Sequence, residues 1–442
     1  MGEAHHKRCN DIMTAKPLNQ LTASEIVAAI AAKKTTAEAV ARACLDHIAA
    51  REPQVEAWQF LDPDLVIKQA RALDASGKVG PLQGVPVGIK DIIDTADMPT
   101  GLGSPLYATR QPQWDASCVA AARAAGAIMM GKTVTTEFAH FTAGKTRNPH
   151  NIERTPGGSS SGSAAAVADR MVPLAFGSQT AGSLIRPATF CGIIGYKPTY
   201  GDFSLSGIRP FAESLDTLGV LARSVDDIAL LSSVLAGLPA RAVVAPLPAP
   251  PVLGLCLTPQ GNAADASVHA VLAASAEKLR RAGATVRDVV LPPEFTPLVD
   301  AQKTIMAYEA ARNYVFETTR HLDGVTPAFA AFCETGWHTR HEDYVAAKAA
   351  VAQAAAMMRA AFAGCDALVT PAAAGEPPLA AAGTGDPLFC RMWTALHLPC
   401  LAVPAGSGPA GLPIGIQLVG LHGADAALLS VGRWVDSALA TA

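Results

Sequence analysis

The chain has 442 residues, half of them hydrophobic and 17% charged, so it is long enough to bury a substantial core. Its 35 basic and 38 acidic residues give a net charge of −3, and this balance, without a basic amphipathic stretch, excludes a case for binding nucleic acid or a membrane surface. The nine cysteines are scattered without a CxxC pair, which predicts a reduced, cytoplasmic protein.

The N-terminal residues 1–20 are polar and lack the apolar core of a signal peptide, so we expect a loose tail. The two segments that follow carry helix-start patterns. Thr22 with Glu25 and Thr35 with Glu38 have the spacing of a capping box, in which each partner satisfies a free N–H group of the first turn. They predict two amphipathic helices.

From residue 57 onward, short apolar runs alternate with helical segments. Asp115 is expected to cap one of the helices. Expected strands are 57–60, 85–89, 127–130, 172–176, 252–257, 284–291, 366–370 and 400–403. Expected helices are 65–75, 115–125, 162–170, 264–281, 297–315 and 342–363. This alternation predicts an α/β fold with a mixed, largely parallel central sheet covered by helices on both faces.

The domain organisation is expected to be simple. A proline-rich segment, 246–251, divides a core of about 70–230 from a subdomain of about 250–395, but no long linker is present. We therefore expect one domain over 21–442. The uncharged run 392–424 has the length of a membrane span, but its prolines and glycines favour buried strands and turns.

The densest run of glycine and serine lies between Thr155 and Lys197. It contains two small-residue turns, PGGSSSGS (156–163) and GSQTAGS (177–183), separated by about one helix and one strand. Small residues let main-chain N–H groups approach a ligand closely, and serines on such turns can reach a substrate. Far upstream, VPVGIKD places Lys90 at the end of an apolar run. We interpret these segments as the active site.

These motifs resemble those of the amidase signature family of serine hydrolases. That family carries a Lys-Ser-Ser triad: a lysine after an apolar strand, a serine in a GGSS turn and a nucleophilic serine in a TGGS-like turn. The matching residues here are Lys90, Ser159 and Ser183. The resemblance runs from about Leu21 to the C-terminus and includes three further segments: GKTVTTEFA (131–139), NPHNIERTPGG (148–158) and GLPIGIQLVG (411–420).

The resemblance implies a role for each triad residue. Ser183 would be the nucleophile, and a serine hydroxyl needs a base within hydrogen-bond reach. Ser159, which would follow a cis peptide bond after Gly158, would relay the proton between Ser183 and Lys90. This requires Lys90 to be neutral, and burial at the end of an apolar strand can lower a lysine pKa by several units.

The GSQTAGS turn is expected to hold the oxyanion. The main-chain N–H groups of Thr180, Ala181, Gly182 and Ser183 would stabilise the tetrahedral intermediate. The family usually reads TDTGGS, whereas this chain reads SQTAGS, with Gln179 in place of the aspartate. The replacement removes a charge at that position and leaves the triad intact.

A second departure follows the nucleophile. The family usually reads S-I-R-x-P, whereas here Ser183-Leu-Ile-Arg186-Pro187 places the arginine three residues on. If Ser183 begins a helix, position i+3 returns to its face. We hypothesise that Arg186 binds a substrate carboxylate, which suits a guanidinium, as in branches such as malonamidases that act on small acid amides. The alternative is a structural pair with Asp202 or Asp216.

Three other patterns point to functions that we do not expect. Residues 126–133 match the phosphate-binding pattern GxxxxGK[ST], but they follow a predicted helix and have an apolar, strand-like interior. His338, His341 and Glu342 lack a further metal ligand. Cys191 has apolar neighbours and is interpreted as a packed thiol. No metal or cofactor is expected.

The expected activity is that of a serine amidase. It would cleave the carboxamide C–N bond of a small linear amide, with or without a carboxylate, through a seryl acyl-enzyme. The alternative is an ammonia-transferring amidotransferase subunit that works with a partner protein. A nucleotide-binding protein and a non-catalytic scaffold are weaker alternatives. A small-molecule amide is the expected binding partner, and the family resemblance allows a homodimer.

Overall fold

The computed structural model describes residues 16–239 and 244–441. Its centre is a sheet of eleven strands among these residues. The strands are β1 (Trp58–Phe60), β2 (Pro86–Lys90), β3 (Ile128–Thr133), β4 (Leu174–Gln179), β5 (Ile194–Lys197), β6 (Thr217–Ala222), β7 (Val252–Leu255), β8 (Thr285–Asp288), β9 (Ala367–Pro371), β10 (Cys400–Ser407) and β11 (Pro413–Val419). Their order across the sheet is β1-β3-β2-β4-β6-β5-β10-β11-β9-β7-β8.

The α/β class and the mixed sheet are confirmed, but the expected predominance of parallel strands is wrong. Parallel pairing joins β2 to β3 and β4, and β7 to β8 and β9. The other six pairings between the described strands are antiparallel. Strands β5 and β6, which we did not predict, and β11, which lies in the run 392–424 expected to hold buried strands and turns, account for most of them. Antiparallel neighbours need no helical crossover, so the alternation of strands and helices overstated the parallel share.

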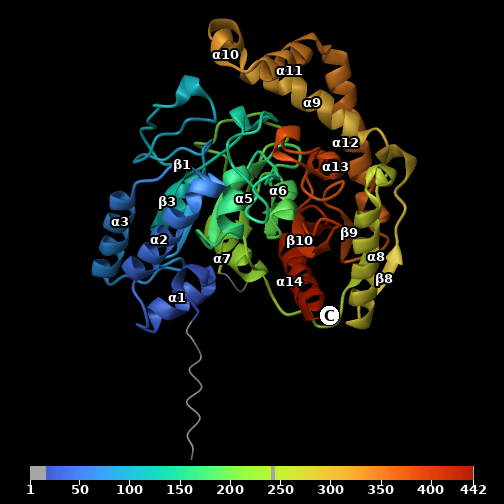
Figure 1. Cartoon of the computed structure of the whole chain (residues 1–442). Coiled ribbons are helices and arrows are strands. Elements are labelled where there is room, and N and C mark those ends of the chain that lie inside the picture. The colour runs from blue at the N-terminus through green and yellow to red at the C-terminus, as the bar shows by residue number, and fades with distance from the viewer. Residues whose placement is uncertain (1–15, 240–243, 442) are drawn as a thin grey trace, which may run out of the picture.

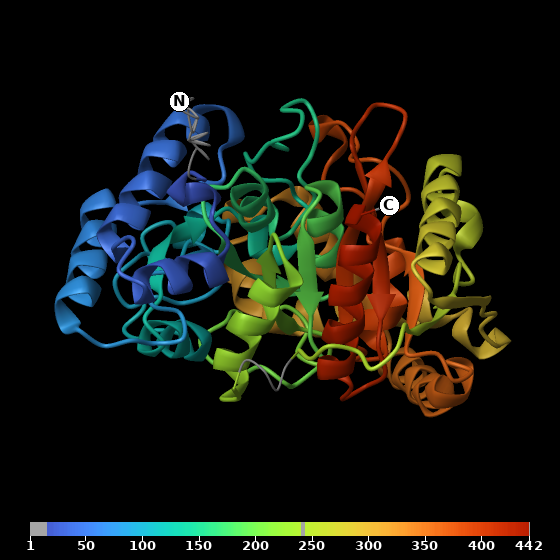
Figure 2. The same ribbon diagram turned by 90° about the horizontal axis from the view of Figure 1, so that it is seen from below.

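Helices cover the sheet on both faces, as expected. Helices α7 and α14 contact each other, and between them they contact strands β5, β6, β10 and β11. Helices α5 and α6 also contact each other, with α5 on strands β2, β3, β4 and β6 and α6 on strands β5, β10 and β11. Figure 1 shows α1, α2 and α3 on the β1 side and α8 on the β8 side, and Figure 2 shows the molecule from below. The helices are α1 (Ala23–Ala31), α2 (Ala37–Val55), α3 (Pro63–Ser76), α4 (Ser117–Ala124), α5 (Ser161–Ala168), α6 (Ile185–Phe190), α7 (Val225–Ala236), α8 (Ala266–Arg281), α9 (Leu298–Asn313), α10 (Val315–Arg320), α11 (Pro327–His338), α12 (His341–Ala361), α13 (Leu388–Ala395) and α14 (Asp425–Thr441).

The helix-start predictions are partly confirmed. Thr22 forms the complete capping box of α1. Helix α2 is capped by Thr36, one residue later than expected. Asp115 does not cap α4, because its carboxylate accepts a hydrogen bond from the main chain of Ala96 and pairs with Arg123 at 2.9 Å. A carboxylate next to a helix start can thus form an ion pair and a loop hydrogen bond instead of capping the helix.

The expected tail, core and subdomain can be compared with the structure. Most of the predicted tail lies outside the described residues, and Leu18–Gln20 form a short 3₁₀ helix. Strands β7, β8 and β9, from the region 250–395, belong to the same sheet as the strands of the 70–230 core. The single domain over 21–442 stays a prediction. Within the described ranges, no helix is long and apolar enough to cross a membrane.

Candidate active site

The two small-residue turns and Lys90 meet at one edge of the sheet. Lys90 is the last residue of β2, and the GSQTAGS segment begins within the end of β4, the parallel neighbour of β2. The carboxyl ends of parallel strands lie at the same edge, where α/β folds commonly place their sites. The PGGSSSGS turn leads into α5, and Ser183 stands two residues before α6. The topology therefore brings segments far apart in sequence to one place.

Glycines in the strands let the two turns pack directly against the sheet. A Cβ added at Gly177 would lie 2.7 Å from Cδ2 of Leu184, which directly follows the GSQTAGS turn, and 2.9 Å from Ser160 Oγ of the PGGSSSGS turn. A Cβ at Gly219 would lie 2.3 Å from Leu184 Cδ1. All three distances are shorter than a carbon side chain tolerates. The small residues of β4 and β6 thus set the approach of the turns to each other.

Lys90 is buried and contacts two serines. Its Nζ hydrogen-bonds Ser159 Oγ at 2.6 Å and Ser178 Oγ at 2.7 Å. Burial lowers the pKa of Lys90 from 10.5 to about 7, and the nearby charge of Asp216 opposes this shift by raising it. A lysine in this state is neutral in a large fraction of molecules near neutral pH, so its amine can accept a proton.

Ser183 lies on the neighbouring turn and is 8% exposed. Its carbonyl accepts a hydrogen bond from the N–H group of Ser160 at 3.4 Å, which ties the two turns together. The peptide bond between Gly158 and Ser159 is cis, as the resemblance implies. Over the described ranges, the side chains of Ser159 and Ser183 form no hydrogen bond with each other. The structure thus contains the Lys90–Ser159 contact of the expected triad, with Ser183 on the adjoining turn.

The GSQTAGS turn has its carbonyls bound and its N–H groups free. The carbonyl of Thr180 accepts a hydrogen bond from Gln302 Nε2 at 2.9 Å, and that of Ala181 accepts one from Thr394 Oγ1 at 2.8 Å. The N–H groups of Thr180 and of residues 181–183 donate to no other group in the part of the chain that the structure describes. This arrangement presents preorganised donors, the requirement for stabilising an oxyanion.

Asp216 holds the same turn from another side. Thr180 Oγ1 donates to Asp216 Oδ1 at 2.5 Å, while Oδ2 accepts from the N–H groups of Phe211 and Ala212 at 2.7 and 3.0 Å. Burial raises the pKa of the Asp216 carboxyl from 3.8 to about 7, and these three hydrogen bonds oppose the rise. The sequence suggested Asp216 only as a partner for Arg186, and it is not one.

Arg186 lies against the PGGSSSGS turn and is 1% exposed. Its Nη2 donates to the carbonyl of Gly158 at 2.6 Å and to Thr384 Oγ1 at 3.2 Å, whereas its Nε and Nη1 have no partner. Burial lowers the pKa of its guanidinium to about 10. Neither Asp202 nor Asp216 pairs with it within the described ranges, so the structural pair that was the alternative is not formed.

Gln179, which stands where the family usually has aspartate, holds the start of α6. Its Oε1 accepts hydrogen bonds from the N–H groups of Leu184 and Ile185 at 2.9 and 3.1 Å, and its Nε2 donates to Thr394 Oγ1 at 3.0 Å. Ile185 stands where the family usually has arginine. Compared with the usual family pattern, the chain therefore lacks both the negative charge at position 179 and the positive charge at position 185. The neutral amide of Gln179 holds the start of α6 instead.

Sequence reasoning missed several residues around the site. Ser178 could have been found, because it lies in the GSQTAGS turn at the end of a predicted strand. Thr394 and Gln302 carry no sequence signal, since their contacts with the turn cross 213 and 122 residues of chain. Their positions follow from the packing of α13 and α9 over the turn, which only the structure shows.

The patterns that we discounted have ordinary structural roles. Most of the segment 126–133 is strand β3, and its Lys132 is buried, where it hydrogen-bonds Thr100 and pairs with Asp91 at 3.1 Å. A strand with its lysine in the core cannot cradle phosphate. Cys191 is buried. No group of three or more metal-ligating side chains occurs within residues 16–239 and 244–441.

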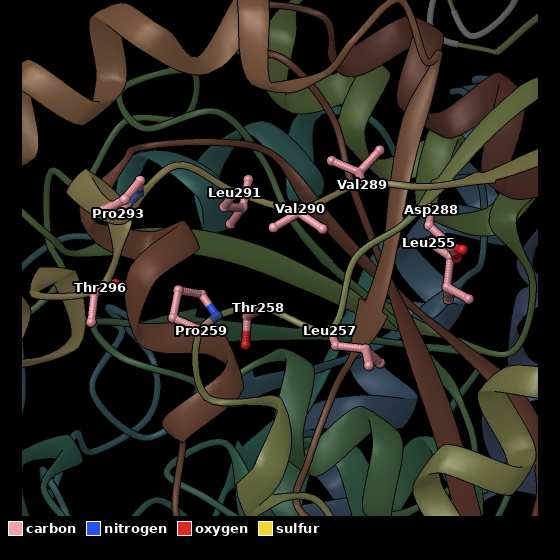
Figure 3. A pocket seen from close by; sticks show the side chains of 10 residues that line it. All are labelled: Leu255, Leu257, Thr258, Pro259, Asp288, Val289, Val290, Leu291, Pro293 and Thr296. Atoms are coloured by element: carbon pink, nitrogen blue, oxygen red, sulfur yellow. The ribbon is translucent and has the colours of Figure 1, made fainter.

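Two hollows differ in their relation to the site. One of about 200 Å³ adjoins it and is lined by Ser178, Thr180 and Asp216 together with mostly apolar side chains. A larger surface pocket of about 760 Å³ lies apart, beside β7 and β8, between the segments 255–259 and 288–296. Figure 3 shows the mainly apolar side chains that line it. The larger pocket holds none of the site residues.

Comparison with known proteins identifies the family. The family described as Amidase matches residues 39–429, and the chain belongs to this amidase signature family of enzymes. It is similar to a glutamyl-tRNA(Gln) amidotransferase subunit of Chloroflexus aggregans, with 34% identity over 94% of this chain and 96% of that protein. The corresponding subunit of Roseiflexus castenholzii is 35% identical over 94% of this chain and 95% of that protein.

Two solved structures show the same fold. A crystal structure of an amidase is similar to this chain, with a TM-score of 0.87 and 30% sequence identity. The match covers 95% of this chain and 100% of the amidase chain. The native peptide amidase of Stenotrophomonas maltophilia has a TM-score of 0.83 and 28% sequence identity. This match covers 96% of this chain and 98% of the peptide amidase chain. The family and the fold are therefore established.

Proposed function

We propose that this protein cleaves the carboxamide C–N bond of a small amide through a seryl acyl-enzyme and releases ammonia. The observation that carries the proposal is the buried contact between Lys90 and Ser159. It joins a lysine whose pKa is lowered to about 7 to a serine beside the Ser183 turn. A buried amine that is neutral in about half of the molecules at pH 7 can serve as the base that a serine nucleophile needs.

Each residue has a defined step in the proposed reaction. Ser183 Oγ attacks the amide carbonyl, and its proton passes through Ser159 to Lys90. The free N–H groups of Thr180 and of residues 181–183 stabilise the oxyanion, an effect worth about 3–4 kcal/mol for each donor in other enzymes. The proton then returns through Ser159 to the leaving nitrogen. Water attacks the acyl-enzyme by the same relay and frees the carboxylic acid.

A second candidate is an amidotransferase subunit that delivers ammonia with a partner protein. The names of the curated relatives favour this role over that of a stand-alone hydrolase, since the relatives are amidotransferase subunits that this chain matches over nearly their full length. Both roles use the same amide cleavage at Ser183. They differ in whether ammonia is released to water without a partner.

Arg186 bears on the substrate in either role. Its unpaired Nε and Nη1 are buried at the start of α6, three residues after the nucleophile, where they suit a carboxylate. We propose that Arg186 binds an acidic group of the amide, whether the substrate is a dicarboxylic acid mono-amide, as in the malonamidase branch, or glutamine.

The test is ammonia release from malonamate, glutamine, a neutral aliphatic amide and an aryl amide, by wild type and by Ser183→Ala. Turnover that is lost in Ser183→Ala supports amide cleavage at Ser183, and turnover by the purified chain alone favours the hydrolase. Turnover of glutamine only after addition of a protein co-purified from the source organism favours the amidotransferase role. Equal turnover by wild type and Ser183→Ala would refute the assignment of the nucleophile.

A further inference from the structure

A second buried arginine lies close to the candidate site and has no assigned role. Arg391, on α13, is 6% exposed. Its Nη1 donates to Gln302 Oε1 at 2.6 Å, and its guanidinium lies 5.6 Å from the ring centroid of Phe141. Its Nε is buried without a hydrogen-bond partner. One amide oxygen is a weak counterpart for a buried cation.

Arg391 and Arg186 share the same lack of a counter-ion. Neither lies within 4.0 Å of a carboxylate in the described part of the chain. The charge of Asp386 acts on both, yet Asp386 is exposed and forms no ion pair with either. Three guanidinium nitrogens, Nε and Nη1 of Arg186 and Nε of Arg391, are buried and unpaired. Buried cations are costly unless an anion accompanies them.

The contacts of α13 place Arg391 beside the GSQTAGS turn. A Cβ added at Gly182 would lie 3.1 Å from the Cβ of Cys390, the residue before Arg391. One turn further along the helix, Thr394 binds the carbonyl of Ala181 at 2.8 Å. Gln302 links Arg391 to the same turn, because its amide nitrogen donates to the carbonyl of Thr180.

We propose that Arg391 and Arg186 together form a subsite for the carboxylate of the substrate, so that the amide cleaved here carries an acid group close to its carboxamide. This rests on the proposed function and names its substrate class. An incoming carboxylate would supply the missing counter-ion of both guanidiniums and could accept from their free nitrogens. Arg391 is thus a specificity-determining residue with a charge-dependent role.

The test compares acidic and neutral amides of matched shape. Malonamate is paired with malonamide, and glutamine with glutamine methyl ester, for wild type, Arg391→Gln and Arg391→Lys. We expect Arg391→Gln to lower kcat/KM at least tenfold for the acidic member, mainly through KM, and less than threefold for the neutral one. Arg391→Lys should recover part of the loss because it restores the charge. Arg312→Gln, at an arginine stacked on Tyr308 away from the site, is the control.

Other outcomes separate the two proposals. Equal losses on acidic and neutral amides would show that Arg391 acts only by holding Gln302 and the turn, and they would overturn the subsite. A wild type that turns over no amide leaves the proposed function without support, and calorimetry then decides the subsite. Malonate, succinate and glutarate should bind Ser183→Ala protein at least tenfold more tightly than they bind Ser183→Ala with Arg391→Gln. Equal binding, or no binding to Ser183→Ala, would overturn the subsite. Binding of sulfate as tight as that of the dicarboxylates would overturn it in favour of a free-anion site.

Discussion

The state of Lys90 predicts the pH dependence of the reaction. Burial lowers its pKa from 10.5 to about 7, which makes its protonation about 5 kcal/mol less favourable than in water, at about 1.4 kcal/mol for each pH unit. The active form is the neutral amine, so activity should rise with pH through about 7. The neutral fraction is about 9% at pH 6 and about 91% at pH 8, and kcat/KM should therefore rise about tenfold and then level off.

The assay is ammonia release at low substrate concentration from pH 5 to 10, with a substrate whose own groups do not titrate in that range. Circular dichroism at each pH checks that the protein stays folded. A lysine with its ordinary pKa would instead give a rate that climbs about tenfold per pH unit up to about pH 10. Such a profile, or a rate independent of pH between 6 and 8, would refute the argument that burial supplies the base.

Two further predictions concern the groups that support the site. Asp216→Asn keeps an acceptor for Thr180 but removes the charge that raises the pKa of Lys90, so the midpoint of the pH profile should move to lower pH; an unchanged midpoint, or a move to higher pH, would contradict this coupling. Gln179→Ala leaves the N–H groups of Leu184 and Ile185 without their acceptor, so the free energy of unfolding should fall by about 1–3 kcal/mol in urea titrations. The variant Gln54→Ala, at an exposed glutamine, is the control. Equal losses of unfolding free energy in the two variants would show that the hydrogen bonds of Gln179 do not stabilise the fold.

The turns and the lysine were predictable because each is a short local pattern. Glycine and serine density marks a turn that can approach a ligand, and the apolar run before Lys90 marks a buried strand end. The structure brings Lys90 and Ser159 together at 2.6 Å, as the matched motifs imply. The mixed α/β class was predictable for a similar reason, since strand and helix lengths follow from the periodicity of apolar residues.

The rest depends on contacts that no local pattern carries. Strand β6 pairs antiparallel with both β4 and β5. Its place between them is set by these pairings along the sheet and not by a local sequence pattern. Arg391 directly precedes the uncharged run 392–424 and was not singled out from the sequence, yet α13 carries it into the core beside the turn. Asp115 failed as a helix cap because Arg123, eight residues on, competes for its carboxylate.

The most direct test of the central claim is covalent labelling of the nucleophile. We would treat the protein with a small sulfonyl fluoride at pH 8 and locate the adduct by peptide mass spectrometry. The account predicts one adduct, on the peptide that contains Ser183, which is absent from Ser183→Ala and forms at least tenfold more slowly in Lys90→Met. An adduct on Ser159 instead, or equal labelling of Ser183→Ala and wild type, would contradict the assignment of Ser183 as the nucleophile.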